Sequence, residues 1–282
     1  MHTQKILILH PGAMGSAVAS RLRDNGHDIY WLPAGRSRDT QERARQAGLQ
    51  AFESLTEGVA QCAVVVSICP PHAALSLAAE VAQQGFTGHY IDANAVAPQT
   101  SAEVAEIVSA AGASYTDGGI IGPPPADSRK ARLYLSGPEA AKLAPLFDTP
   151  ALTAIALDGG EYSASALKMC FAGWNKARTA LLLNLRALAA EHEVDDALLA
   201  EWAQMDPAAV RLFDSGSVNS NALKAWRWSA EMTEIATTFE AAGLPGDFHH
   251  GAAEVFQRLE AFKDEKQAPA LAALTDSLRR GK

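Results

Sequence analysis

The 282-residue chain has little cysteine, no excess of positive charge and no long apolar run. Its three cysteines, Cys62, Cys69 and Cys170, are an odd number without metal-ligand spacing, which argues against a disulfide framework and favours a reducing cytoplasm. A net charge of -8 provides no basic field, so nucleic acid is not an expected partner. No stretch approaches the roughly 18 to 20 apolar residues of a membrane span, and the N-terminus lacks the pattern of a signal peptide.

What the chain does contain is typical of a folded protein, with 48% hydrophobic and 20% charged residues. Its length is about twice that of a usual single domain, so we expect two domains, 1–158 and 159–282. The first reads as an α/β domain and the second as an all-helical domain. The two are separated by a change of composition at Gly159-Gly160.

The first part alternates short β-rich runs with amphipathic helical stretches. Seven strands are expected, at 5–9, 28–32, 63–68, 89–93, 114–119, 131–137 and 152–157. Four helices are expected between the early strands, at 14–25, 40–47, 72–84 and 99–111. Continuous apolar strands separated by helices predict a Rossmann-type, doubly wound parallel sheet that is covered on both faces.

The second part shows no convincing strand. An alanine- and leucine-rich stretch at 162–192 predicts one long helix. Further helices are expected at 195–204, 207–214, 222–242 and 247–262. A helix of about 45 Å extends beyond a small domain unless another subunit covers it, so we expect a homodimer through the helical domain.

A glycine turn follows the first strand and opens the first helix. Gly12 and Gly15 match the second and third glycines of the dinucleotide fingerprint, and His10 replaces the first. We therefore expect Gly12, Ala13, Met14 and Gly15 to hold the pyrophosphate. The alternative is a tight turn that binds no ligand.

The residues that follow the second predicted strand indicate whether NAD or NADP is bound. NAD-binding folds usually place an acid there, but here no acid occurs before Asp39. Arg36, Ser37 and Arg38 instead offer cations and a hydroxyl suited to a 2′-phosphate, which favours NADP(H). The alternative is that one or both arginines form a solvated helix start.

Four ordered segments and the long helix together resemble the β-hydroxyacid dehydrogenase superfamily, which includes 6-phosphogluconate and 3-hydroxyisobutyrate dehydrogenases. The segments are the turn at 12–15, Ser67-Ile68-Cys69-Pro70-Pro71, the D-x-S-T-x-x-P-like stretch at 91–98 and Tyr115-Thr116-Asp117-Gly118-Gly119. The resemblance implies that Cys69, Pro70 and Asn94 contact the cofactor and that Gly119 lies near the substrate. It also implies a dimer through the helical domain. We expect this NADP-binding first domain and a second domain for substrate binding and dimerisation to form the active site in the cleft between them.

The same resemblance implies that Lys168 is the general acid/base for hydride transfer between an alcohol and a carbonyl. A lysine whose pKa is lowered by burial can take a proton from a hydroxyl and return it. Lys168 lies early in the long helix beside Met169 and Cys170, where a lysine is costly unless it is paired or useful. The alternative is a lysine that extends its stem to solvent.

Departures from the family pattern concern the substrate. Ile121 stands where the family has a carboxylate-binding serine, and Phe171 and Ala172 replace polar residues that usually follow the lysine. The site should therefore take a more apolar substrate than a small hydroxy acid, or orient it differently. Asn175 either substitutes in part for the missing groups or belongs to a polar stripe.

Two rival functions stay open: an imine reductase-type enzyme on the same fold, and a non-catalytic NADP-binding protein. His249-His250 lacks further ligands, so no metal is expected. A group in the second part, Trp226, Trp228, Met232 and Glu234, could wall a pocket, although core packing is the better interpretation of its apolar members.

Overall fold

A computed structural model of the chain describes residues 3–205, 207–208, 210, 217–263 and 265–279. The chain forms two compact units, 1–169 and 170–282. The sequence places the boundary before the long helix, between the ranges 1–158 and 159–282, whereas the two units divide inside that helix. The first turns of that helix, with Lys168, therefore belong to the sheet-containing unit.

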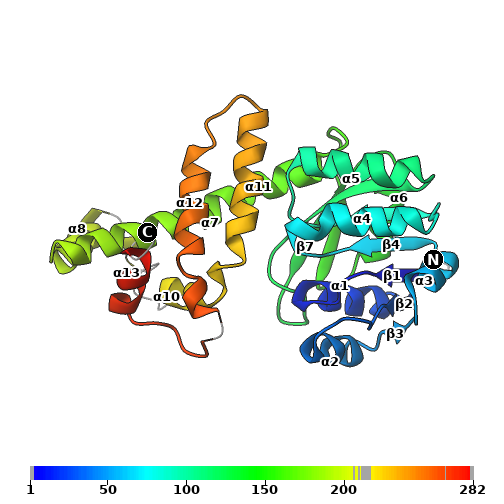
Figure 1. Ribbon diagram of the computed structural model, residues 1–282, viewed down its shortest axis with the longest axis horizontal. Coiled ribbons are helices and arrows are strands. Elements are labelled where there is room, and N and C mark those ends of the chain that lie inside the picture. The colour runs from blue at the N-terminus through cyan, green and yellow to red at the C-terminus, as the bar shows by residue number, and fades with distance from the viewer. Residues whose placement is uncertain (1–2, 206, 209, 211–216, 264, 280–282) are drawn as a thin grey trace. The chain divides into compact units, whose positions relative to one another are not determined.

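The first unit is built on one eight-stranded sheet (Figure 1). Its strands are β1 (Lys5–Ile8), β2 (Asp28–Trp31), β3 (Gln50–Ala51), β4 (Val64–Ser67), β5 (His89–Asp92), β6 (Ser114–Ile121), β7 (Ala131–Ser136) and β8 (Leu152–Ala156). Their spatial order is β3-β2-β1-β4-β5-β6-β7-β8. All seven predicted strands are present, and the doubly wound fold class is confirmed. β3 was not predicted, because two residues carry no β pattern.

One strand pair departs from the predicted parallel arrangement. β7 runs antiparallel to β6, whereas every other neighbouring pair in the sheet is parallel. The connection from Gly122 to Lys130 contains no helix. A segment this short joins antiparallel strands but cannot make the crossover that parallel strands need.

Helices cover both faces of the sheet (Figure 1). They are α1 (Ala13–Asp24), α2 (Arg38–Gln46), α3 (Leu55–Gln61), the 3-10 turn η1 (Pro71–Ala73), α4 (Ala74–Gln83), α5 (Pro98–Ala110) and α6 (Ala140–Phe147). Successive residues of a strand point to opposite faces, so Ile6 packs with α1 and α6, and Leu7 packs with α4 and α5. The unpredicted helices α3 and α6 contain Gly58 and Pro145, which weaken the helical pattern.

The second unit contains helices and no strand within its described residues. It begins inside α7 (Ser163–Glu191) and continues with α8 (Asp195–Met205), α10 (Ser217–Ala225), α11 (Trp228–Ala241), α12 (Asp247–Gln257), η2 (Glu260–Phe262) and α13 (Leu271–Arg279). The predicted helix 222–242 is two helices separated by a turn, and α13 was not predicted. The predicted helix 207–214 lies largely outside the described residues. None of the described helices is long and apolar enough to cross a bilayer.

The helices α11 and α12 pack side by side in this unit (Figure 1). Met232 and Phe256 are fully buried there, and the Trp228 ring meets Phe256 edge-on at 5.2 Å between centroids. Lys176 of α7 forms a largely buried ion pair with Glu231 of α11. These contacts support the core-packing interpretation of Trp228 and Met232.

Candidate functional site

The carboxyl ends of β1, β4, β5 and β6 lie at one edge of the sheet, because these strands are parallel. The chain order reverses between β1 and β4, and doubly wound folds bind their ligands in the crevice at such a point. The glycine turn, the loop at Cys69 and the loop at Asn94 all follow strands at this edge. The first unit alone therefore brings together most of the predicted cofactor residues.

The glycine turn has the form that a pyrophosphate requires. Gly12 is the N-cap residue of α1, and no side chain caps this helix end. A Cβ added to Gly12 would meet nothing within 4 Å, so the space in front of the helix amides is open. A Cβ on Gly15 would lie 2.0 Å from the carbonyl oxygen of His10, so only glycine allows this helix to pack on β1. Open space at an uncapped helix N-terminus fits an anionic dinucleotide.

Arg36 lies over the end of β1. Its guanidinium contacts Nε2 of His10 and donates to the carbonyl oxygen of Leu9 at 3.4 Å. Burial, reinforced by the charge of Arg36, lowers the pKa of His10 to about 4. The imidazole is therefore neutral at physiological pH and accepts from Arg36 without cancelling its charge.

The two neighbours of Arg36 have different environments. The Ser37 hydroxyl caps α2, accepting from the Thr40 amide at 3.3 Å and donating to the Thr40 hydroxyl at 3.1 Å. Arg38 is the first residue of α2 and is exposed. The solvated-helix-start interpretation thus describes Arg38, whereas Arg36 turns toward the nucleotide edge.

Asn94 links the loops that follow β4 and β5. Its side-chain oxygen accepts from the amide of Cys69 at 2.5 Å, and its side-chain nitrogen donates to the hydroxyl of Ser67 at 3.0 Å. Its own amide donates to Asp92 at 2.9 Å. Asn94 is buried. Its amide group therefore holds the Cys69 loop in place, a role that the family resemblance alone did not specify.

Lys168 reaches the end of β6 from α7. Its Nζ donates to the carbonyl oxygen of Ile120 at 3.0 Å. A Cβ on Gly119 would lie 2.6 Å from the carbonyl oxygen of Ala164 and 3.1 Å from the Cβ of Lys168, so this glycine permits the close approach of helix and strand. The structure thus brings Lys168 and Gly119 together at the edge that carries the nucleotide loops.

The other two predicted substrate residues, Ile121 and Asn175, make contacts of their own within the protein. Ile121 is 3% exposed and packs inside the first unit. Asn175 lies in the second unit, and its side chain donates to the Phe171 carbonyl of its own helix at 2.9 Å. Sequence reasoning also missed a residue: Asp117, whose carboxylate joins β6 to the start of α7. The signal for it was the one charged residue of this strand, two positions before Gly119.

The comparisons with known proteins agree with this architecture. Residues 6–156, more than half of the chain, match the NAD binding domain of 6-phosphogluconate dehydrogenase, and residues 189–259 match a domain of unknown function, DUF1932. These findings define the first unit as a dinucleotide-binding domain of the dehydrogenase type. The chain belongs to that family, within the β-hydroxyacid dehydrogenase superfamily, as its motifs predicted.

Individual relatives add detail to this assignment. An uncharacterized 28.5 kDa protein of Methanothermus fervidus is 30% identical over 190 residues, which cover 67% of this chain and 72% of that protein. The structure of a Mycobacterium tuberculosis 3-hydroxyisobutyrate dehydrogenase is similar over 99% of this chain and 100% of its own, with 18% identity and a TM-score of 0.72. An imine reductase of Streptomyces aurantiacus is similar over 97% and 99%, with 17% identity and a TM-score of 0.55. At these identities the two structures share the fold.

Proposed function

We propose that this protein is an NADP(H)-dependent oxidoreductase in which Lys168 is the general acid/base. The observation that carries the proposal is the position of Lys168 Nζ, hydrogen-bonded to the Ile120 carbonyl at the sheet edge that holds the glycine turn. In the superfamily's reaction the bound cofactor supplies or accepts the hydride. Lys168 then donates a proton to the carbonyl oxygen during reduction, or takes it from the hydroxyl during oxidation.

A single substitution tests this role. Lys168→Met retains the volume of the stem and removes the ammonium, so fold and NADPH affinity should be preserved. Turnover should fall by about two to four orders of magnitude, the usual worth of positioned proton transfer. The assay uses NADPH with whichever compound is converted fastest among hydroxy acids, aldehydes, ketones and cyclic imines.

The control is the same change at an exposed lysine. Lys142 is paired with Glu139 on the surface of the first unit, so Lys142→Met should leave turnover at the wild-type value. A Lys168→Met variant that keeps more than about a tenth of wild-type turnover would remove Lys168 from the mechanism.

We propose NADP(H) rather than NAD(H) because Arg36 presents its charge at the nucleotide edge. The neutral partner His10 orients the guanidinium and leaves it available for a phosphate dianion. Arg36→Ala should raise the dissociation constant of NADPH by about tenfold or more and change that of NADH little. Arg38→Ala, at the exposed helix start, is the matched control. Equal losses for both cofactors in Arg36→Ala would contradict the assignment.

An imine reductase-type reaction is the second candidate, and a specific observation favours it. The position of the family's carboxylate-binding serine is occupied by Ile121, which is buried and apolar. Such a site favours a substrate without a carboxylate, such as an apolar ketone or cyclic imine. Faster reduction of cyclic imines than of ketones and aldehydes with NADPH would select this candidate.

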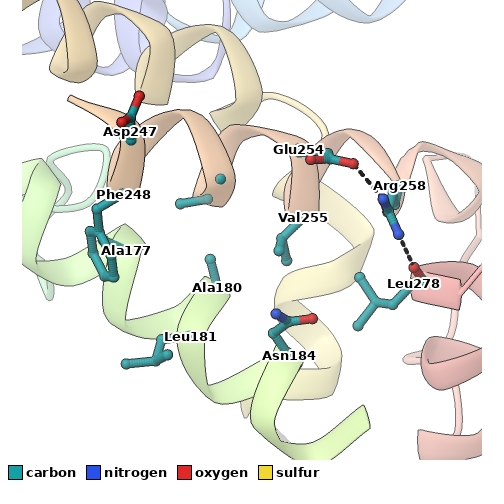
Figure 2. A pocket seen from close by; sticks show the side chains of 12 residues that line it. Ala177, Ala180, Leu181, Asn184, Asp247, Phe248, Glu254, Val255, Arg258 and Leu278 are labelled. Atoms are coloured by element: carbon teal, nitrogen blue, oxygen red, sulfur yellow. Dashed lines mark hydrogen bonds and ion pairs between the residues drawn. The ribbon is translucent and has the colours of Figure 1, made fainter. Parts of the chain in front are cut away.

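We further propose a homodimer through the helical unit. Trp174, Leu181 and Leu188 follow one another at seven-residue spacing along α7, and all three are exposed. Figure 2 shows Leu181 and Phe248 at one end of a hollow of about 350 Å³ between α7 and α12, with Arg258 and its partners at the other. Contiguous exposed apolar surface marks an association site, and a stripe repeated along one helix can meet its own copy across a two-fold axis.

A further inference from the structure

The first turn of α7 is held by side chains of the sheet. The amide of Ala164 donates to the hydroxyl of Ser136 at 2.9 Å, and the amide of Ser165 donates to the carboxylate of Asp117 at 2.8 Å. A helix N-terminus leaves four amides without intrahelical partners, and a cap usually comes from the adjoining residue. Here strands β6 and β7 supply it, so the cap also fixes where the helix starts relative to the sheet.

Asp117 has a full set of donors. Besides the Ser165 amide, its oxygens accept from the hydroxyls of Ser165 at 2.5 Å, Ser101 at 2.9 Å and Ser136 at 3.0 Å. The residue is 1% exposed. Burial raises the pKa of Asp117, and the hydrogen bonds from Ser165, Ser101 and Ser136 oppose that rise. Four donors at a helix N-terminus suit an ionised carboxylate.

Strand β6 and helix α7 also contact each other at Gly119 and Lys168. Gly119 follows Asp117 by two residues and so points to the same face of β6, and Lys168 follows Ser165 by three residues on the same side of α7. The Gly119 backbone meets Ala164 and the Lys168 stem there, and Lys168 Nζ binds the Ile120 carbonyl. Asp117 and Gly119 therefore fix two points of one helix–strand contact, and Lys168 lies at the second.

We propose that Asp117 is a positioning residue for Lys168: its carboxylate sets the register of α7 on β6 and thereby the location of the Lys168 ammonium. It acts through the helix, and the hydrogen bonds of its carboxylate go to Ser101, Ser136 and Ser165 rather than to the glycine turn. This inference rests on the proposed role of Lys168. The positioning role of Asp117 can be tested separately from the catalytic role of Lys168, because the environment of Nζ can be probed without measuring turnover.

The test compares two alanine variants at the same carboxylate. Ser165→Ala removes a donor on α7, whereas Ser101→Ala removes a donor on α5 and leaves both α7 bonds to Asp117 in place. Asp117→Asn is the stronger variant, and Ser165→Ala serves if that protein does not fold. For each we would measure kcat, KM, NADPH affinity and the rate at which formaldehyde and a borohydride reagent methylate Lys168, with Lys142 as the internal reference.

Asp117→Asn should lower kcat by about ten- to a hundredfold, the range expected for a misplacement on the order of 1 Å. NADPH affinity should be unchanged. The methylation rate of Lys168 relative to Lys142 should rise by about threefold or more, because the ammonium is released from its position. Ser165→Ala should show the same pattern more weakly, and Ser101→Ala should keep the wild-type kcat and methylation rate.

The possible failures are distinguishable. Wild-type turnover in Lys168→Met would overturn the proposed function, while the methylation rates would still report on positioning. If Lys168→Met is inactive but folded Asp117→Asn retains the wild-type kcat and methylation rate, the positioning role is wrong. Equal effects of Ser165→Ala and Ser101→Ala would also contradict it, because they would indicate a general loss of stability.

Discussion

The two units differ in where they place polar side chains and large apolar side chains. The first buries polar groups such as Asn94 and Asp117 and provides them with hydrogen-bond partners from its own strands and helices. The second exposes large apolar side chains: Trp174 is 68% exposed, Leu188 57% and Leu181 45%. Among the described residues of the first unit, the only exposed large apolar side chain is Leu75.

The two units therefore depend on different kinds of interaction for their stability. Buried hydrogen-bonded groups are costly to break and hold a local geometry, which suits a site that must place a proton donor. Exposed apolar surface gains stability only when something covers it. The first unit is therefore expected to be self-sufficient, and the second to depend on association.

The largest expected effect comes from a charge on the apolar stripe of α7. Leu181→Glu should weaken the proposed dimer by at least about a hundredfold, because a central apolar contact would have to bury a carboxylate. Light scattering at micromolar concentration measures the change. Leu244→Glu, an exposed leucine in the turn after α11, is the matched control and should stay dimeric. A wild-type protein that is already monomeric would contradict the proposal.

The next effect distinguishes fold from binding in the first unit. Gly15→Ala places a Cβ against the His10 carbonyl and should lower the free energy of unfolding by several kcal/mol, about the cost of severe overpacking. Gly12→Ala meets no protein atom, so its stability should be close to that of the wild type while NADPH affinity falls. Thermal unfolding with and without NADPH measures both. A Gly12→Ala variant that is stabilised by NADPH as strongly as the wild type would show that the turn holds no pyrophosphate.

The same contrast explains what the sequence could predict. The strands of the first unit are short, continuous apolar runs, and the glycine turn lies directly after one of them, so both were found. The hydrogen-bond donors of Asp117 come from Ser101, Ser136 and Ser165, which are far apart in the chain and meet only when α5, β7 and α7 fold together. No local pattern contains that information.

In the second unit the sequence predicted the all-helical class correctly but placed some helix boundaries wrongly. Residues 222–242 have a continuous helical pattern, yet the chain turns at Trp226 and Arg227 between α10 and α11. No proline or glycine marks this turn, so tertiary packing decides it. Asn175 shows the same limit, since its bond to its own helix could not be read from its spacing to Lys168.

The smallest expected effect concerns Asp92, a buried carboxyl beside Asp117 in the sheet. Burial raises its pKa from 3.8 to about 7, so the folded chain binds this proton more tightly than the unfolded chain does. Its favourable contribution to stability is complete below about pH 4 and is lost as the pH rises through about 7. Asp92→Asn keeps an oxygen for the Asn94 amide and removes the charge. Relative to the wild type, its Tm should therefore rise by roughly 5 °C between pH 5 and pH 9. Asp39→Asn, at the exposed start of α2, is the control and should run parallel to the wild type. Parallel curves for Asp92→Asn as well would show that this carboxyl ionises in the folded chain as readily as in the unfolded one.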